Sequence, residues 1–228
     1  MSPREQFDRD LNDLRSQVLK LGTLVSKQFD LALQVLDTLD PVLAKQIIAG
    51  DQEINETRFA IEAFCFTLVA TQQPAARDLR AIFAAMNMIV DFERMGDKVK
   101  DIAETIPHIL KAPDQPRPGK LTRMANLVKT MLDQCILAYA NSDIELAKDL
   151  AIQDEKLAAL FSDVLERVIE DLAKATKEKK VTASFGILRT AQHLERIGDL
   201  ATNVAERILY IPTGDMQDMK AHQQDTID

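Results

Sequence analysis

The sequence predicts an all-α protein made of two tandem three-helix bundles, six long helices in all, related by internal duplication. Three observations lead to this fold class. The pattern Glu-Arg-apolar-Gly-Asp occurs at 93–97 and again at 195–199, 102 residues later. Helix-favouring residues such as Ala, Leu, Glu and Lys dominate the composition. Alternating runs of Val, Ile, Thr and Tyr, which are typical of strands, are missing.

The repeat is longer than its five central positions. When 93–106 is compared with 195–208, seven of the fourteen positions are identical, and Asp101 is replaced by the similar Asn203. The 228 residues therefore divide into a first repeat at 1–111, a linker at 112–119, a second repeat at 120–211 and a polar, acidic tail at 212–228 that we expect to be disordered.

Two helices are predicted before the first motif helix. Ser2-Pro3-Arg4-Glu5 combines a capping residue, a proline and an acid in the order typical of a helix start, and this helix continues to about Thr38. Asp40-Pro41 starts the second helix, which ends near Thr71. Apolar residues recur every three or four positions in the first of these helices: Phe7, Leu11, Leu14, Val18, Leu21 and Val25.

The third helix carries the first motif. Pro74 opens it, it ends near Leu110, and Pro107 is expected to kink or fray its last turn. The segment 112–119 contains three prolines and one glycine, so it is the clearest linker in the chain.

The second half repeats this arrangement. A fourth helix is predicted from about Lys120 to Tyr139, and Ser142-Asp143-Ile144-Glu145 is interpreted as a capping box for a fifth helix that ends near Lys177. The segment 177–180 is expected to be a solvated turn. The sixth helix carries the second motif and is expected to stop before Pro212.

The motif acids share one side of each motif helix. At about 100° per residue, Phe92 and Met95 fall on the core stripe, whereas the acids fall on the opposite side. Gly96 and Gly198 lie between the two sides. We therefore single out as candidate metal ligands Glu93, Asp97, Asp101, Glu195 and Asp199.

Two interpretations of these acids remain open. Acids opposite an apolar stripe are usually a solvated face. However, acids four residues apart repel one another, and a glycine inside a helix costs about 1 kcal/mol relative to alanine. Carboxylate oxygens bind Mg²⁺, Mn²⁺ or ferric iron, so a metal site on each bundle surface would explain both features.

Further acids lie outside the motifs. Asp154 falls on the apolar stripe of the fifth helix, where it is either buried with a partner or exposed at the margin of the stripe, and Arg189 and His193 are candidate partners. Asp51 and Asn55 lie at the edge of the stripe of the second helix and are placed to join the Glu93 face.

Composition excludes several classes of function. A net charge of −8 argues against nucleic acid as the main partner. No apolar run approaches the roughly 20 residues that span a bilayer, and the N-terminus lacks the apolar core of a signal peptide, so we expect a cytoplasmic protein with no direct membrane insertion. Cys65 and Cys135 are expected to be buried, reduced thiols.

The duplicated motif resembles the repeated Glu-Arg-Ile-Gly-Asp signature of the PhoU family, with Met95 in place of Ile in the first copy. The resemblance covers nearly the whole chain. It implies a negative regulator of the phosphate-starvation response that also modulates phosphate uptake. It further implies contact with the ATPase subunit of a phosphate ABC transporter and with a phosphate-sensing histidine kinase, and a homodimer. Some family members bind iron or other metals at acidic helix faces. This implies the five ligands named above and, as the bound metal, iron or another divalent metal (Mg, Mn, Zn).

Other functions are disfavoured by the residues themselves. A ferritin-like di-metal enzyme needs Glu-x-x-His motifs, and none of His108, His193 and His222 follows a Glu at that spacing. A phosphotransfer bundle would use His193, which lies off the core direction at the surface or margin of its helix. No glycine-rich phosphate loop or nucleophile–base pair is present, so we expect neither an enzyme nor an organic cofactor. A metal-independent helical adaptor that docks basic partner surfaces remains the main alternative.

Overall fold

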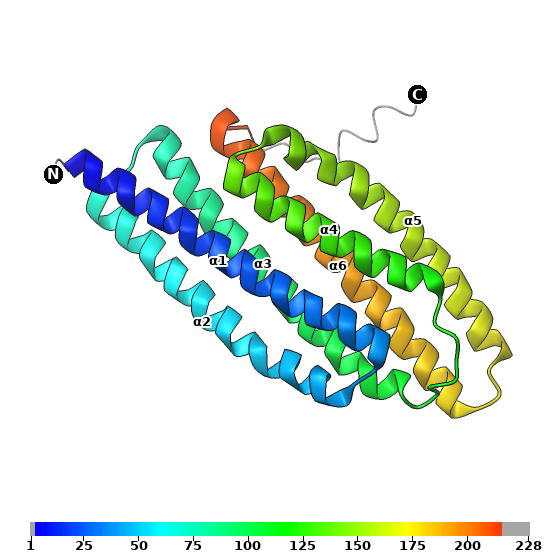
Figure 1. Ribbon diagram of the computed structural model, residues 1–228. Coiled ribbons are helices and arrows are strands. Elements are labelled where there is room, and N and C mark those ends of the chain that lie inside the picture. Colours follow the sequence, from blue (N-terminus) through cyan, green and yellow to red (C-terminus); the bar gives the residue numbers. More distant parts are fainter. Residues whose placement is uncertain (1–2, 216–228) are drawn as a thin grey trace, which may run out of the picture.

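The computed structural model describes residues 3–215, and these form six long helices joined by short connections (Figure 1). The tail prediction for 216–228, His222 and the predicted cap at Ser2 lie outside the described residues. The helices are α1 (Pro3–Thr38), α2 (Pro41–Gln72), α3 (Ala76–Ile109), α4 (Gly119–Asn141), α5 (Ile144–Lys174) and α6 (Glu178–Thr213). The all-α prediction and the position of each motif on the third helix of its half are confirmed.

Several helix boundaries differ from the predictions. The third helix begins at Ala76, because Gln73 and Ala76 have the left-handed φ values of 46° and 47° that turn the chain after α2. Ser142 is not the cap of α5: it is left-handed (φ 52°) and ends α4, and the Asp143 side chain accepts the Leu146 amide instead.

The helices of the second half also overrun predicted breaks. The segment predicted as a solvated turn at 177–180 contributes Glu178, Lys179 and Lys180 to the first turn of α6. Pro212 lies inside α6, which ends at Thr213, and Pro107 lies inside α3. A proline in the last turn removes only one backbone hydrogen bond from a helix end that already frays. Both helices therefore continue for one or two residues beyond their proline.

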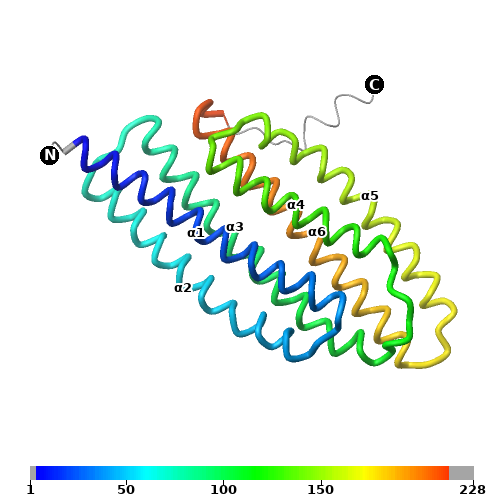
Figure 2. Tube along the Cα trace, in the orientation of Figure 1, coloured from blue at the N-terminus to red at the C-terminus, as the bar shows by residue number. Residues whose placement is uncertain are grey.

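The two halves pack against each other along their long axes. Each second helix lies on the outside, α2 against α1 and α3, and α5 against α4 and α6. The contact between halves is made by α3 with α6 and by α1 with α4. Figure 2 traces α2 and α5 along opposite edges of the molecule. The α3–α6 pair is antiparallel, since Asp101 lies beside His193 and Thr105 Oγ1 lies 2.8 Å from Thr190 Oγ1.

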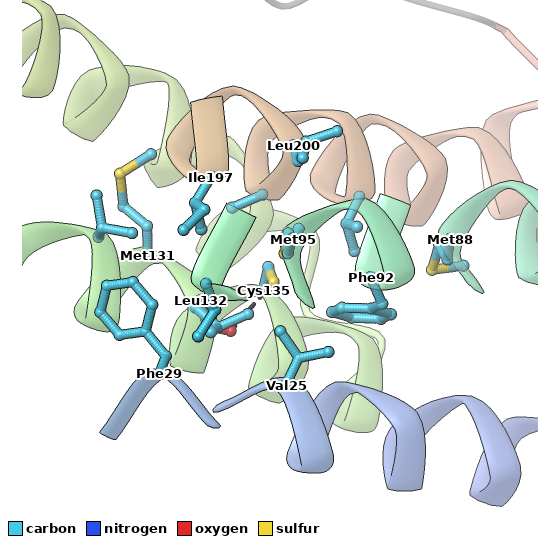
Figure 3. Packing of buried hydrophobic residues seen from close by; sticks show 14 of the residues in the cluster. Val25, Phe29, Met88, Phe92, Met95, Met131, Leu132, Cys135, Ile197 and Leu200 are labelled. Atoms are coloured by element: carbon cyan, nitrogen blue, oxygen red, sulfur yellow. Dashed lines mark hydrogen bonds between the residues drawn. The ribbon is translucent and has the colours of Figure 1, made fainter. Parts of the chain in front are cut away.

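Two tandem three-helix bundles are expected to bury one core each, and that expectation is wrong for this protein. One continuous cluster of buried apolar side chains includes residues from all six helices. Figure 3 shows Phe29 of α1, Met95 of α3, Leu132 of α4 and Ile197 of α6 in the same packed region. The reason is that α3 and α6 are buried on more than one side: small residues such as Ala103 and Ala205 are also inaccessible.

The structure also bears on the predictions for the cysteines and for membrane-spanning segments. Cys65 and Cys135 are free and buried, as predicted, and burial raises the pKa of the Cys65 thiol to about 11. Within residues 3–215, no helix has both the length and the apolar character needed to cross a bilayer.

Candidate functional site

Three carboxylates of the first half form one group, which we call the first acidic cluster: Glu93 and Asp97 of α3, and Asp51 of α2. Glu93 and Asp97 are half-buried, and Asp51 is 7% exposed. Burial raises the pKa of both Glu93 and Asp97, with a further contribution from neighbouring negative charge: chiefly Asp97 for Glu93, and Asp51 for Asp97. The motif acids are therefore partly covered and lie beside Asp51 of α2.

Basic and amide groups partly neutralise this cluster. Lys100 Nζ lies 3.0 Å from Asp51 Oδ2, and Asn55 Nδ2 donates to the same oxygen at 3.2 Å. The prediction that Asp51 and Asn55 lie beside the Glu93 face is thus confirmed. In the part of the chain that the structure describes, the buried Asp51 Oδ1 has no hydrogen-bond partner.

Asp101 is directed away from the first acidic cluster, toward α6. Its carboxylate pairs with Lys98 on its own helix, and Asp101 Oδ2 lies 3.5 Å from His193 Nδ1. His193 is half-buried, and burial lowers its pKa although Asp101 opposes this effect. The Asp101–His193 pair therefore joins the two halves.

The corresponding carboxylates of the second half, which we call the second acidic cluster, are Asp154 of α5 and Glu195 and Asp199 of α6. Asp154 stands three residues before Leu157, which lies against Gly198, as Asp51 stands three residues before Ile54, which lies against Gly96. All three side chains of the second acidic cluster are half-buried, which places Asp154 at the margin of its stripe. Asp199 Oδ2 lies 3.3 Å from Arg196 Nη1, so one motif residue neutralises another. Asn203, which replaces Asp101 in the repeat, carries no charge.

The first acidic cluster matches a hard cation in donor chemistry, because it offers carboxylate oxygens and one of them is buried without a partner. Its side chains are not arranged as a coordination sphere: among the described residues, no group of three or more His, Cys, Asp or Glu side chains converges closely enough to hold a metal ion. Binding a cation here would require the carboxylates to rotate toward one another and Lys100 to release Asp51.

The two motif glycines have a structural explanation. A Cβ at Gly96 would lie 2.9 Å from Ile54 Cδ1, and one at Gly198 would lie 2.2 Å from Leu157 Cδ2. Each glycine allows the motif helix to approach the second helix of its own half. The glycines therefore do not by themselves argue for a binding site.

Comparison with known proteins places this architecture in a family. The family model described as "PhoU domain" matches residues 18–106 and again residues 121–208. This chain belongs to the PhoU domain family. Each match contains one copy of the motif, so the predicted resemblance and the duplication are both confirmed.

Individual PhoU relatives are similar to this chain over nearly their full length. A Clostridium acetobutylicum protein described as "Phosphate-specific transport system accessory protein PhoU homolog" is 30% identical over 95% of this chain and 98% of its own. The crystal structure of a phosphate transport system regulatory protein PhoU from Streptococcus pneumoniae is similar, with a TM-score of 0.86 at 31% identity, covering 93% of this chain and 99% of that one. PhoU from Pseudomonas aeruginosa also gives 0.86, at 30% identity, covering 92% of this chain and 100% of that one.

Asp91 is a further ionisable residue of this PhoU chain that the sequence analysis missed. It is 7% exposed at the α3–α6 interface, and burial raises its pKa from an ordinary value near 3.8 to about 6. Arg94, Arg207 and a hydrogen bond with Asn203 oppose this rise. The repeat contains a signal for Asp91, because the residue 102 positions later is His193. The Asp91–Asn203 contact is thus the counterpart of the Asp101–His193 contact, with the two motif helices exchanged.

The raised pKa of Asp91 predicts a pH-dependent stability. Because the folded protein binds the Asp91 proton more tightly than the unfolded chain, this residue stabilises the fold below about pH 4, and that contribution is lost as the pH rises to about 6. We expect Asp91→Asn to raise the free energy of unfolding at pH 7 by about 2 kcal/mol, and to change it little at pH 4. Urea denaturation of both proteins at the two pH values measures this. An equal effect at both pH values would contradict the prediction.

Proposed function

We propose that this protein is a negative regulator of the phosphate-starvation response and a modulator of phosphate uptake. The observation that carries the proposal is the pair of PhoU domain matches, together with full-length relatives described as accessory proteins of phosphate-specific transport. Such a protein acts by contact with partners rather than by catalysis, and we propose no enzymatic activity for it.

The proposed partners are the ATPase subunit of a phosphate ABC transporter and a phosphate-sensing histidine kinase, with the regulator acting in the cytoplasm as a homodimer. Exposed apolar side chains support an interaction role. Phe59 and Phe66 are 60% and 59% exposed on α2, and Phe83 is 48% exposed on the adjacent α3. Exposed aromatic side chains grouped on neighbouring helices are typical of protein interfaces.

Deleting the gene tests the proposed function. We expect a phosphate-starvation reporter, such as secreted alkaline phosphatase, to become active in phosphate-rich medium, because the kinase would no longer be held in its phosphatase or inactive mode. The intact gene supplied in trans should restore repression. Repression that persists in the deletion strain, with the reporter still inducible by starvation, would overturn the proposal.

We further propose that the acidic clusters hold a cation such as iron, manganese, magnesium or zinc, with Glu93, Asp97 and Asp51 as the first set of ligands. Glu195 and Asp199, with Asp154, are the second set. The raised pKa values of Glu93 and Asp97 support this, because a cation would offset both the burial and the repulsion that raise them. Asp101, held by Lys98 and His193, is the weakest of the five candidate ligands.

Metal retention distinguishes this proposal from the metal-independent adaptor. The protein is incubated with ferric iron or Mn²⁺ and desalted, and we expect elemental analysis to find a stoichiometric amount of retained metal. The variant Glu93→Gln/Asp97→Asn should lose most of the metal bound at the first site. The control Glu53→Gln/Glu56→Gln removes the same charge from exposed positions of α2 and should retain the wild-type amount. Wild-type protein that retains no metal favours the adaptor, whose partner binding should survive chelation and weaken with salt.

A further inference from the structure

A basic cavity lies at the end of the molecule where the α3–α4 linker meets the α5–α6 turn (Figure 1). We call it the lysine cavity. It is open to solvent, has a volume of about 580 Å³ and is lined by five lysines: Lys111, Lys174, Lys177, Lys179 and Lys180. Such a concentration of positive charge is unexpected in a chain with a net charge of −8.

Acidic groups neutralise only part of the charge of the lysine cavity. Asp114 and Asp171 also line it, but Asp171 Oδ1 already lies 3.4 Å from Arg167 Nη2. Lys174 Nζ lies 3.6 Å from Glu170 Oε2. Within the described part of the chain, the other four lysines form no ion pair, so their positive charges are available to a ligand.

Three of these lysines stand where a helix disfavours them. Lys177 is the N-cap of α6 and provides no side-chain cap, and Lys179 and Lys180 lie in the first turn. The N-terminus of a helix carries a partial positive charge, so lysines there are unfavourable, and Glu178 is the acid of this first turn that offsets them. No side chain caps the turn, and the Lys180 amide donates to Lys177 O at 2.9 Å, so the amides of Glu178 and Lys179 are the ones that would attract an anion.

The linker wall of the lysine cavity is fixed to α6. The side-chain Nε2 of Gln115 donates to Ser184 Oγ at 2.8 Å, and the backbone amide of Gln115 donates to Ala112 O at 3.0 Å. Gln115 Oε1 is buried and, among the described residues, has no hydrogen-bond partner. Gln115 therefore holds the linker beside α6 through its hydrogen bond to Ser184.

We propose that the lysine cavity binds a small soluble anion with two or more linked phosphoryl groups, of the inorganic polyphosphate class. Lysines act as separate point charges, and here they come from three chain segments, so they match a ligand whose charge extends over several groups. The described residues that line the cavity include no aromatic side chain on which a nucleotide base could stack. This site goes beyond the proposed function, and either proposal can fail without the other.

Calorimetry with inorganic tripolyphosphate at physiological salt tests the proposal. We expect saturable one-to-one binding that is tighter than that of orthophosphate, and at least as tight as that of ATP. Lys179→Gln/Lys180→Gln, two exposed positions, should raise the Kd at least tenfold. The control Lys20→Gln/Lys27→Gln removes the same charge from exposed positions of α1 and should change the Kd less than twofold.

Three results would overturn the proposal. Equal weakening by both double variants would mean that the anion responds only to overall charge. ATP binding that is tighter than tripolyphosphate binding would mean that a nucleotide is recognised. Sedimentation with anionic lipid vesicles that depends on Lys179 and Lys180, without tripolyphosphate binding, would mean that the lysines contact a membrane surface instead. Circular dichroism of both double variants verifies that they remain folded.

Discussion

Replacing Phe92 with alanine is expected to lower the free energy of unfolding by about 3–5 kcal/mol. Phe92 is 1% exposed, and its ring fills the space that Gly22 leaves on α1: a Cβ at Gly22 would lie 3.1 Å from Phe92 Cζ. Figure 3 places the ring between the α3 backbone and Val25 of α1. Removing it leaves a cavity in the shared core, which the long helices cannot easily collapse to fill. Urea denaturation followed by circular dichroism measures the change.

Phe83 is the matched control for Phe92, because it is the same residue type on the same helix but is 48% exposed. Phe83→Ala should change the free energy of unfolding by less than about 1 kcal/mol. If the two variants unfold at similar urea concentrations, the position of Phe92 in the core is wrong.

Introducing valine at Gly198 is expected to lower the free energy of unfolding by about 1–3 kcal/mol. Even a Cβ there would lie 2.2 Å from Leu157 Cδ2, so the larger side chain requires Leu157 to leave its rotamer or α6 to move away from α5. In an open helix the same change would be nearly neutral or slightly favourable, since glycine is a poor helix former. The direction of the effect therefore distinguishes close packing from helix propensity. Thermal and urea denaturation report it.

Two further variants make the Gly198 prediction specific. Gly119→Val is the control, because nothing lies within 4 Å of a Cβ at Gly119. Leu157→Ala opens space opposite Gly198, so the double variant Leu157→Ala/Gly198→Val should lose less stability than the two single variants added together. Strict additivity would show that Leu157 does not limit the approach of the two helices.

Helical periodicity located the motif helices but not what surrounds them. It placed Glu93 and Asp97 opposite the core stripe, and the structure sets both on α3 beside Asp51 of α2, where they are half-buried. A helical wheel gives the direction of a side chain from its own axis and does not reveal a neighbouring helix that covers that side. For this reason periodicity predicts a surface site, although the acids are half-buried beside a second helix.

Asp91 and Asp101 show the same limit at the contact between the two halves. Each is paired across the α3–α6 interface, Asp91 with Asn203 and Asp101 with His193. The pairing depends on the antiparallel register of two helices about 100 residues apart in the chain. The local sequence pattern does not specify that register. Periodicity therefore does not single out Asp91, and it groups Asp101 with the other motif acids instead of with His193.

The sequence alone determined the all-α class, the duplication, the six helices and the family. Helical periodicity and a repeated motif are local features, so they can be recognised without any tertiary contact. The tertiary structure decided the single shared core, the close packing at Gly96 and Gly198, and the partners of each acid. These features depend on how closely and in what register the helices meet, and packing over the whole chain sets that geometry.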